Sequence, residues 1–427
     1  MYSKKGLYRI FNNNVRKFSV KRKYPIDREA EKNLPVFEYS ISKATYNRIF
    51  VWGCTQTGAL GIRFKKDELE RKISIRHPKR LTFAEQHEVT TIGCGYGFTV
   101  FGVKSTSNVK LFGTGLNTDS QLGYHEVTRG KPLEMVFVPQ PIILPYKNTE
   151  KAKIKKVRGG RAHLVVLTNE GLYLLGNNSY GQCGRPVIQD ENYSKNIACG
   201  QDHTVVLTED GAVYSCGWGA DGQTGLGHYN SESHFTKLQG DISSEKIVKI
   251  STNADFVLAL NEKGDVFGWG NTEYSQIPTD DGSQQICQPT RIKMCDKLGK
   301  IRDVATGGTF CMVLNENGHV FVWGFGLLGV GPSVQSSKAP LQIPSVLFGV
   351  NDFQPDTVVK SIHCGMSHLC AITNYGDLYM WGRNKHDCLG LGDEKDQYFP
   401  LRASLGGLVV DLACGVDHSV ALCKPYI

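Results

Sequence analysis

The sequence lacks a long apolar segment, and it lacks the short motifs of covalent or nucleotide chemistry. Its longest apolar run, residues 320–331, is interrupted by four glycines, whereas a membrane-spanning helix needs about 18 or more apolar residues. No H-E-x-x-H motif, Walker loop or nucleophile triad is present. Two G-x-G-x-x-G matches, at 217–222 and 324–329, are followed by more β-type sequence, but a dinucleotide site needs a helix there. We therefore expect a soluble protein with no transmembrane segment, catalytic residue, metal or cofactor.

Paired cysteines are also missing. The chain has 13 cysteines, an odd number, and no C-x-x-C pair. This spacing suits neither a disulfide framework nor a zinc site. Four of the cysteines, Cys94, Cys199, Cys364 and Cys414, recur at equivalent places of the repeat described below. The pattern predicts buried thiols in a reducing compartment, and the mitochondrial matrix is such a compartment.

Acidic residues are absent from the first 24 positions, which carry eight Lys and Arg residues. The whole chain has a net charge of +8, so the remainder, with 41 basic and 41 acidic residues, is neutral. A basic, acid-free segment with one apolar face is typical of a mitochondrial transit peptide, and Arg16 before Ser19 resembles a processing site. We expect a transit peptide at 1–24, a linker at 25–45, and a place in the matrix or peripherally at the inner membrane. A basic disordered tail or a nuclear-localisation stretch is the alternative.

A five-residue segment, here called the corner, occurs seven times. Its commonest form is C-G-x-x-H, and an alternating apolar run follows each copy. The copies are residues 94–98, 159–163, 199–203, 251–255, 306–310, 364–368 and 414–418. In five copies a turn ending in glycine comes next, as at Asp210-Gly211. Because glycine accepts the positive φ of a tight turn, each copy predicts a β-hairpin.

The second strand of each predicted hairpin ends in glycine, usually after an aromatic residue. The pairs are Trp52-Gly53, Phe112-Gly113, Leu175-Gly176, Cys216-Gly217, Trp269-Gly270, Trp323-Gly324 and Trp381-Gly382. With the strand that follows, each unit has about four strands, the size of a propeller blade. The last corner has no such pair after it, and the first pair has no corner before it. We predict an all-β fold, a seven-bladed β-propeller over 46–427 closed by pairing of its N- and C-terminal strands.

The corner, the glycine turn and the segment from Val213 to Gly227 resemble the regulator of chromosome condensation repeat. The resemblance covers nearly all of the chain after the basic N-terminus, although the fourth corner lacks both Gly and His. It implies a seven-bladed propeller that acts as a guanine-nucleotide exchange factor and performs no covalent chemistry. With the transit-like N-terminus, it implies a mitochondrial GTPase as partner, a dynamin-like fusion GTPase being one candidate. In the family's exchange factor, acidic and His residues near the corners face the GTPase. The resemblance therefore implies four contact candidates here: Asp202, Asp417, His203 and His418.

The repetition itself suggests structural roles for several of these residues. Histidines at positions 163, 203, 368 and 418 occupy equivalent corners, which favours hydrogen bonding in each blade over a metal or catalytic role. The tryptophans are expected to pack between blades. Asp202 and Asp417 stand at only two corners, and a local turn cap is the alternative to a GTPase contact.

A second hypothesis rests on a basic stretch in a long interval. The corner glycines Gly95 and Gly160 are 65 positions apart, against 40 for Gly160 and Gly200. Toward the end of the interval lie the phosphate-contact candidates Lys151, Lys153, Lys155, Lys156, Arg158 and Arg161. Such local charge suits RNA phosphates, with a solvated loop as the alternative. The second hypothesis is thus an rRNA-binding scaffold or assembly factor for the mitochondrial large ribosomal subunit, recruiting RNA-modifying enzymes. The same interval is a candidate wedge against a GTPase.

Overall fold

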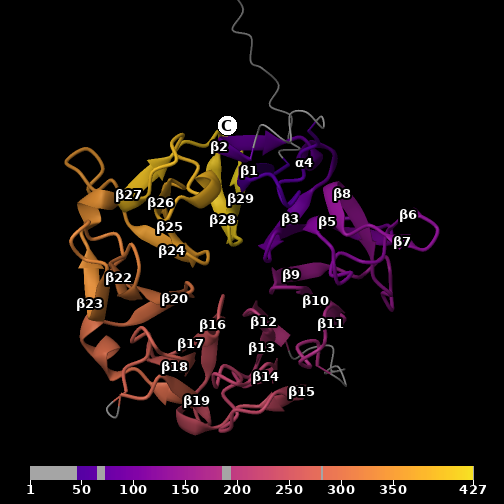
Figure 1. Cartoon of the computed structure of the whole chain (residues 1–427). Helices are drawn as coiled ribbons and strands as arrows, with labels where there is room; N and C mark the ends of the chain where they lie inside the picture. Colours follow the sequence, from indigo (N-terminus) through magenta and orange to yellow (C-terminus); the bar gives the residue numbers. More distant parts are fainter. Residues whose placement is uncertain (1–45, 65–72, 185–193, 280–281, 427) are drawn as a thin grey trace, which may run out of the picture. The chain divides into compact units, whose positions relative to one another are not determined.

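The computed structural model describes residues 46–64, 73–184, 194–279 and 282–426. Seven sheets stand around a central axis and form the predicted seven-bladed β-propeller (Figure 1). Six sheets have four strands, and the seventh has three among the described residues. The transit peptide and linker predicted at 1–45 lie outside these residues.

The strands are grouped by their distance from the axis. The inner strands are β3 (Val89–Cys94), β9 (Ile154–Gly159), β12 (Ser194–Cys199), β16 (Ile247–Ser251), β20 (Ile301–Thr306), β24 (Val359–Cys364) and β28 (Leu408–Cys414). The second strands are β4 (Phe98–Val103), β10 (His163–Thr168), β13 (His203–Thr208), β17 (Phe256–Asn261), β21 (Phe310–Asn315), β25 (His368–Thr373) and β29 (His418–Lys424). The third strands are β5 (Val109–Leu116), β11 (Gly171–Gly176), β14 (Val213–Gly217), β18 (Val266–Asn271), β22 (Val320–Phe325), β26 (Leu378–Gly382) and β1 (Arg48–Cys54). The outer strands are β8 (Met135–Ile143), β15 (Glu232–Lys237), β19 (Gln285–Arg291), β23 (Ser336–Ile343), β27 (Gln397–Ala403) and β2 (Ser74–Leu81).

Short elements lie in the connections between the strands. They are the hairpin β6 (Glu126–Thr128) and β7 (Lys131–Pro132), the helix α4 (Phe83–Gln86), and the 3-10 turns η1 (Gly240–Ile242), η2 (Lys293–Leu298), η3 (Ser345–Phe348) and η4 (Lys385–Asp387). Within the described ranges, no helix has the length and apolar character needed to cross a membrane.

The two ends of the propeller pair in one sheet. The closing blade has the strand order β2-β1-β29-β28, so two strands from each end of the propeller complete it. Strands β1 and β29 are antiparallel from Arg48↔Cys423 to Gly53↔His418. The predicted closure is confirmed, and it gives the closing blade its four strands.

Apolar side chains alternate between the two neighbours of each blade because successive residues of a strand point to opposite faces. In β13, Val205 and Leu207 join a cluster with the next blade, which includes Trp269. Val206 joins the cluster of the preceding blade with Val165. All six residues of β13 are buried. The core is therefore a series of junctions around the ring, each built by two blades.

Tryptophan side chains tie these junctions together, as predicted. The indole Nε1 of Trp269 donates to the carbonyl of Gln223 over 3.0 Å, and that of Trp323 donates to Gln276 over 2.8 Å. In each case the acceptor lies in the loop between the third and outer strands of the preceding blade. Two other residue types take the same place: the Thr114 hydroxyl donates to Gly58 over 2.9 Å, and the Cys216 thiol donates to Gln182 over 3.6 Å.

Strand register corrects two repeat assignments. His203 pairs with Gly217, and the equivalent partners of the next blade are Phe256 and Gly270. The fourth corner is therefore residues 252–256, one position later than predicted. In the blade of β5, Phe98 pairs with Gly115, so the conserved place of the pair falls on Thr114-Gly115 and not on 112–113. Both assignments were wrong because Ser251 was matched to Cys, and Phe112 to Trp, by residue type alone. The pairing register of the strands, which decides the equivalence, is visible only in the structure.

The unusual length of the interval before Gly160 is not caused by the basic stretch. The β6–β7 hairpin supplies the extra residues between β5 and β8. Lys151 and Lys153 come after β8, in the connection to β9. The basic stretch is therefore no protruding insertion, and the segment of the interval to which the wedge prediction applies is the β6–β7 hairpin.

Candidate functional site: the corner face and the central channel

The seven corners lie on one face of the ring, here called the corner face. In every blade, the carbonyl of the fourth corner residue accepts a hydrogen bond from the backbone N–H that follows the conserved glycine of the third strand. Trp218 N–H donates to Asp202, Asn271 N–H to Asp255, and Cys54 N–H to Asp417, each over 2.8 Å. This shared bond places the fourth residues at one level. The glycine turns between second and third strands lie at the opposite face, here called the turn face.

Three fourth-position residues are acidic. Asp202 forms an ion pair with Arg161, and its side chain is 11% exposed. Asp417 lies 3.2 Å from Lys385 Nζ and 3.3 Å from His386 Nδ1, with 21% of its side chain exposed. Burial raises the pKa of Asp202, and the charge of Arg161 opposes that rise. Both predicted acids are thus at the corner face, each already paired with a cation of this chain.

The third acid, Asp255, was missed by the sequence analysis. It accepts hydrogen bonds from Gln201 Nε2 at 2.7 Å and Gln223 Nε2 at 3.4 Å. Burial, followed by the charge of Asp221, raises the pKa of Asp255 to about 6. The misplaced fourth corner had put Asp255 at the His position, where its match to Asp202 was hidden.

A depression of about 380 Å³ opens beside Asp255 on the corner face. Its walls include Tyr274, Phe325, Met366 and Arg383. The rings of Tyr274 and Phe325 stack with centroids 5.3 Å apart, and the two side chains are 38% and 39% exposed. Aromatic, Met and Arg side chains are enriched at protein–protein interfaces, so the walls of this depression resemble a protein-binding surface.

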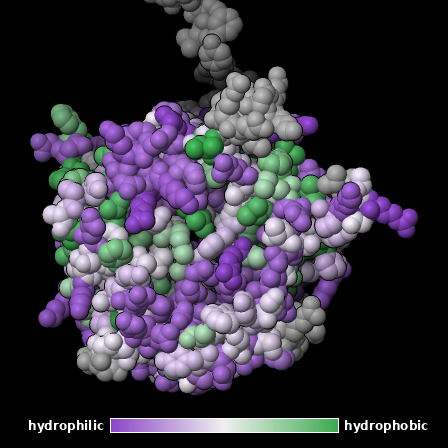
Figure 2. Space-filling view, viewed as in Figure 1, coloured by the Kyte–Doolittle hydropathy of each residue, from purple (hydrophilic) through white to green (hydrophobic). Residues whose placement is uncertain are grey.

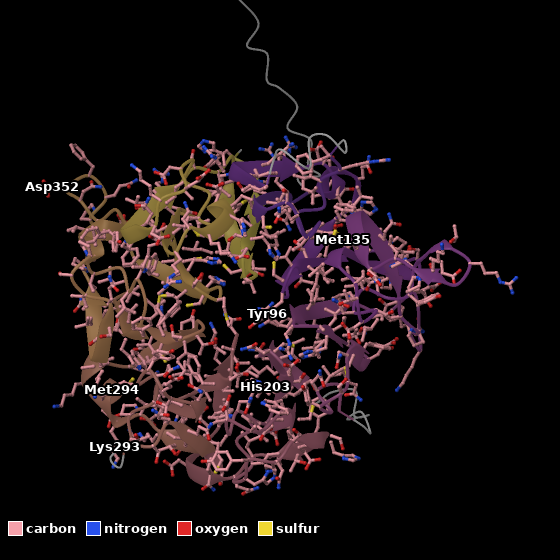
Figure 3. The ribbon with its side chains drawn as sticks, in the orientation of Figure 1. Tyr96, Met135, His203, Lys293, Met294 and Asp352 are labelled. Carbon is pink, nitrogen blue, oxygen red and sulfur yellow. The ribbon has the colours of Figure 1, made fainter. Side chains whose placement is uncertain are left out.

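His203 and His418 are not available for a partner contact. They are 0% and 1% exposed, and burial lowers the pKa of His203 to about 3 and that of His418 to about 4. The His203 ring lies 3.3 Å from the Thr252 hydroxyl, and the His418 ring 3.0 Å from the Thr99 hydroxyl, both in the next blade. The expected hydrogen-bonding role is confirmed as an inter-blade bond, and their place among the GTPase-contact candidates is corrected. Figure 3 shows Tyr96 near the centre of the ring and His203 farther from it, among the blades.

The axis is closed at the corner face by residues from four blades. Tyr96 Oη donates to the Asn253 carbonyl over 2.9 Å and contacts Met366 Sδ at 3.4 Å. The Asn253 side chain donates to the carbonyls of Thr306 and Cys364 over 2.7 and 2.8 Å. Asn253 takes the place of the corner glycine, so the departure of this corner from the repeat builds the closure.

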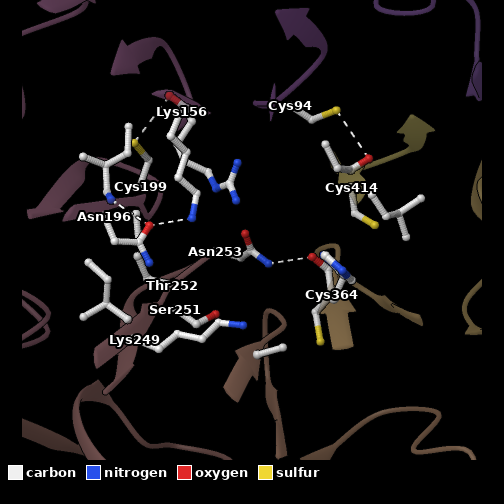
Figure 4. Close-up of a pocket in the computed structure, with 18 of the residues that line it drawn as sticks. Cys94, Lys156, Asn196, Cys199, Lys249, Ser251, Thr252, Asn253, Cys364 and Cys414 are labelled. Atoms are coloured by element: carbon white, nitrogen blue, oxygen red, sulfur yellow. Dashed lines mark hydrogen bonds between the residues drawn. The ribbon is translucent and has the colours of Figure 1, made fainter. Parts of the chain in front are cut away.

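Below this closure the inner strands surround a channel of about 290 Å³ (Figure 4). Lys156, Arg158, Lys249, His363 and Asp411 line it. Lys156 Nζ donates to Asn196 over 2.5 Å, and burial, followed by the charges of Arg158 and Lys249, lowers its pKa to about 6. Lys249 is paired with Asp303. Arg158 donates to the Val157 carbonyl over 2.8 Å. The channel is therefore polar, and among the described residues Lys249 is the one of these three cations that has a carboxylate partner.

The six basic candidates do not form one patch. Lys151 and Lys153 are exposed near the turn face, where their backbones bond Asn169. Lys156 and Arg158 point into the channel, and Arg161 is paired on the corner face. Lys155 is exposed on β9. One strand crosses the ring from face to face, so neighbours in sequence are separated in space.

Figure 2 shows a largely hydrophilic face with small, scattered apolar patches. Of the 13 cysteines, 11 are buried, and Cys287 and Cys414 are partly exposed. The prediction of buried thiols is confirmed, since each repeated cysteine lies where small side chains fit between blades.

Comparison with known proteins shows which families, sequences and structures this chain is similar to. The RCC1-like domain matches residues 185–425, and the regulator of chromosome condensation (RCC1) repeat matches residues 46–101. The chain is 44% identical over 426 residues to the mouse RCC1-like G exchanging factor-like protein, covering 93% of this chain and 92% of that protein. The crystal structure of human WBSCR16 has a TM-score of 0.82 at 43% identity and covers 89% of this chain and 100% of that one. Prp20p from Saccharomyces cerevisiae shares the fold, with a TM-score of 0.74 at 19% identity over 90% of this chain and 93% of that one.

Proposed function

The chain belongs to the regulator of chromosome condensation (RCC1) family, and on that premise we propose that it is a guanine-nucleotide exchange factor whose corner face binds a mitochondrial GTPase. One observation carries the proposal: the depression beside Asp255 joins a carboxyl group to two exposed, stacked aromatic rings. Support comes from the exchange-factor-like mouse relative and from Prp20p, whose binding to Gsp1p has been described. A dynamin-like fusion GTPase is one candidate partner.

An exchange factor needs no nucleophile or general base. It binds the nucleotide-free GTPase more tightly than the nucleotide-bound form, and by linkage this difference speeds nucleotide release. A ring closed by strand pairing and plugged at its axis by Tyr96 and Asn253 presents its loops without rearrangement. Such a surface loses little conformational entropy on binding. Within it, Phe325 and Tyr274 would supply apolar contact area, and Asp255 would orient a donor group of the partner.

The test uses the full chain as bait for mitochondrial GTPases stripped of nucleotide. A captured GTPase is then loaded with a fluorescent GDP analogue, and release is timed with and without the protein. Phe325→Ala and Asp255→Asn should each slow release, by about tenfold for a central contact residue. Phe353→Ala is the matched control, since Phe353 is 97% exposed in the connection after η3, on the turn side. No capture by the wild type, or equal release with Phe325→Ala and Phe353→Ala, would contradict the proposal.

A second candidate function, RNA binding, has one observation in its favour. Lys151, Lys153 and Lys155 are all exposed where β8 leads into β9, away from the corner face. Reversing all three to Glu should weaken binding to mitochondrial rRNA and lower the salt slope by about 0.7 per lost phosphate contact. Lys293→Glu, in η2, is a single-site control on another blade. If RNA binding does not change, the three lysines are a solvated connection, and exchange is expected to be unaffected in either case.

The mitochondrial location is proposed from the charge of residues 1–24, eight basic and no acidic. A fusion of residues 1–40 to a fluorescent reporter should enter mitochondria, and N-terminal sequencing of the imported protein should begin at Ser19. Replacing Arg9, Arg16 and Lys17 with Gln should reduce import, because the membrane potential draws positive charge inward. A nuclear or cytosolic reporter would refute the location.

A further inference from the structure

The first residue of each corner faces the preceding blade at a fixed place. Its neighbour there is the residue two positions after the corner histidine or phenylalanine of that blade. Cys199 shares a cluster with Val165, Cys364 with Met312, and Cys94 with Val420. At these three junctions the residue opposite the thiol is therefore an apolar side chain, and small-residue packing explains the cysteine.

The junction between the blade of β25 and the closing blade departs from this pattern. The equivalent pair there is Cys414 and Cys370, whose sulfur atoms are 3.5 Å apart. The His368 ring completes a group in which one ligand atom of each residue lies within 4.8 Å of the others. Cys370 and His368 are 0% exposed. Another buried thiol, that of Cys388, donates to the Arg383 carbonyl over 3.3 Å and is not part of this group.

We propose that His368, Cys370 and Cys414 bind a zinc ion at this junction, with water as the fourth ligand. Two thiolates and an imidazole are the donors that Zn²⁺ prefers. With Zn–S bonds of about 2.3 Å, sulfur atoms 3.5 Å apart subtend an S–Zn–S angle of about 100°. That angle is near the tetrahedral value, so the two sulfurs need little movement.

Charge balance favours the same assignment. Zn²⁺ with two thiolates and a neutral imidazole has no net charge, so the site can be buried without a counter-ion. Binding releases the two thiol protons to solvent, and no oxidant is needed. A disulfide, in contrast, would require the sulfurs to approach to about 2.05 Å. The ligands come from β25 and the end of β28, so the ion would join the last complete blade to the one that closes the ring.

The experiment measures zinc in the full chain purified without chelators. Cys370→Val is the decisive variant because Val165 and Val420 hold the equivalent place at other junctions, so the fold should accept it. Cys199→Ser is the matched control: it is also a corner cysteine, but its thiol donates to the Arg158 carbonyl over 3.6 Å. Mass spectrometry should find about one zinc per wild-type and Cys199→Ser chain, and less than about a tenth of that in Cys370→Val.

Cobalt provides a second readout. Co²⁺ added to the stripped wild-type protein should produce thiolate-to-metal absorption, and Cys370→Val and Cys414→Ser should not. Two results would overturn the proposal: a wild-type chain that holds no zinc and takes up no cobalt, or equal uptake by Cys370→Val. A Cys370–Cys414 disulfide, found by peptide mapping after alkylation without reductant, would overturn it as well.

Discussion

The Tyr96 phenol donates a hydrogen bond to the Asn253 carbonyl over 2.9 Å, although the two residues belong to blades that are not neighbours in the ring. Asn253 in turn holds the carbonyls of Thr306 and Cys364 in two further blades. Most contacts of a propeller join adjacent blades only. This group of bonds instead links four blades at the axis and explains why the fourth corner has no glycine.

Asn253→Gly would restore the usual corner residue but remove both side-chain hydrogen bonds. Because two buried carbonyls lose their donor, we expect a loss of about 2 kcal/mol in the free energy of unfolding. Tyr96→Phe should cost about 1 kcal/mol. Urea denaturation measures both, with Tyr375→Phe, whose hydroxyl bonds Asp356 at the surface, as the control. Equal stability of Asn253→Gly and the wild type would show that the closure contributes nothing.

The corner histidines should make the fold sensitive to acid. Burial lowers the pKa of His203 to about 3 and that of His163 to about 4, from 6.5. Between those values the unfolded chain binds protons that the folded chain does not, so stability is lost as the pH falls below 6.5. His203→Phe, which copies Phe256 and Phe310, should reduce this acid slope while costing about 1 kcal/mol at pH 7 for the lost Thr252 bond. An unchanged slope in denaturation from pH 7 to 4 would contradict the assignment.

Lys156 should affect stability in the opposite pH range. Its pKa is lowered from 10.5 to about 6 by burial and by the nearby cations. From pH 6 to 10.5 the unfolded chain binds a proton that the folded chain lacks, so stability rises with pH. Lys156→Met should raise stability at pH 7 and flatten this rise. Lys155→Met, at the exposed neighbour, should do neither, and the same pH profile for both variants would refute the shift.

Closure by both termini predicts an all-or-none response to truncation. Deleting Asp411–Ile427 removes most of β28 and all of β29, which leaves β1 without its antiparallel partner. The truncated chain should lose its cooperative thermal transition, because the edge of β1 and the apolar junctions on both sides of the closing blade become exposed. Calorimetry tests this directly. A truncated protein that melts like the full chain would show that the closing blade is dispensable.

The sequence by itself determined the blade number, the closure and the role of the repeated residues. Backbone φ and strand periodicity are local properties. The corner glycines, the turn glycines such as Gly211 and the alternating apolar runs are therefore enough to predict the strands from the sequence. Seven copies then allow one closed ring. Asp202 and Asp417 were found in the same way, as exceptions at a repeated position.

Only the tertiary structure decided which of these residues can meet a partner. The strand register showed that Asp255 occupies the same corner position as Asp202 and Asp417. Phe325 and Tyr274 come from different blades, and only the fold brings their rings into contact. The residues of the basic stretch lie on different faces because β9 runs from one face of the ring to the other. His203 and His418 are buried in the junctions between blades, so they cannot contact a partner. The thiols of Cys370 and Cys414 are 44 positions apart but 3.5 Å apart in space. Sequence spacing reports neighbours along one strand, whereas a ring of blades makes its sites across junctions, between residues whose separation in the chain is about one blade.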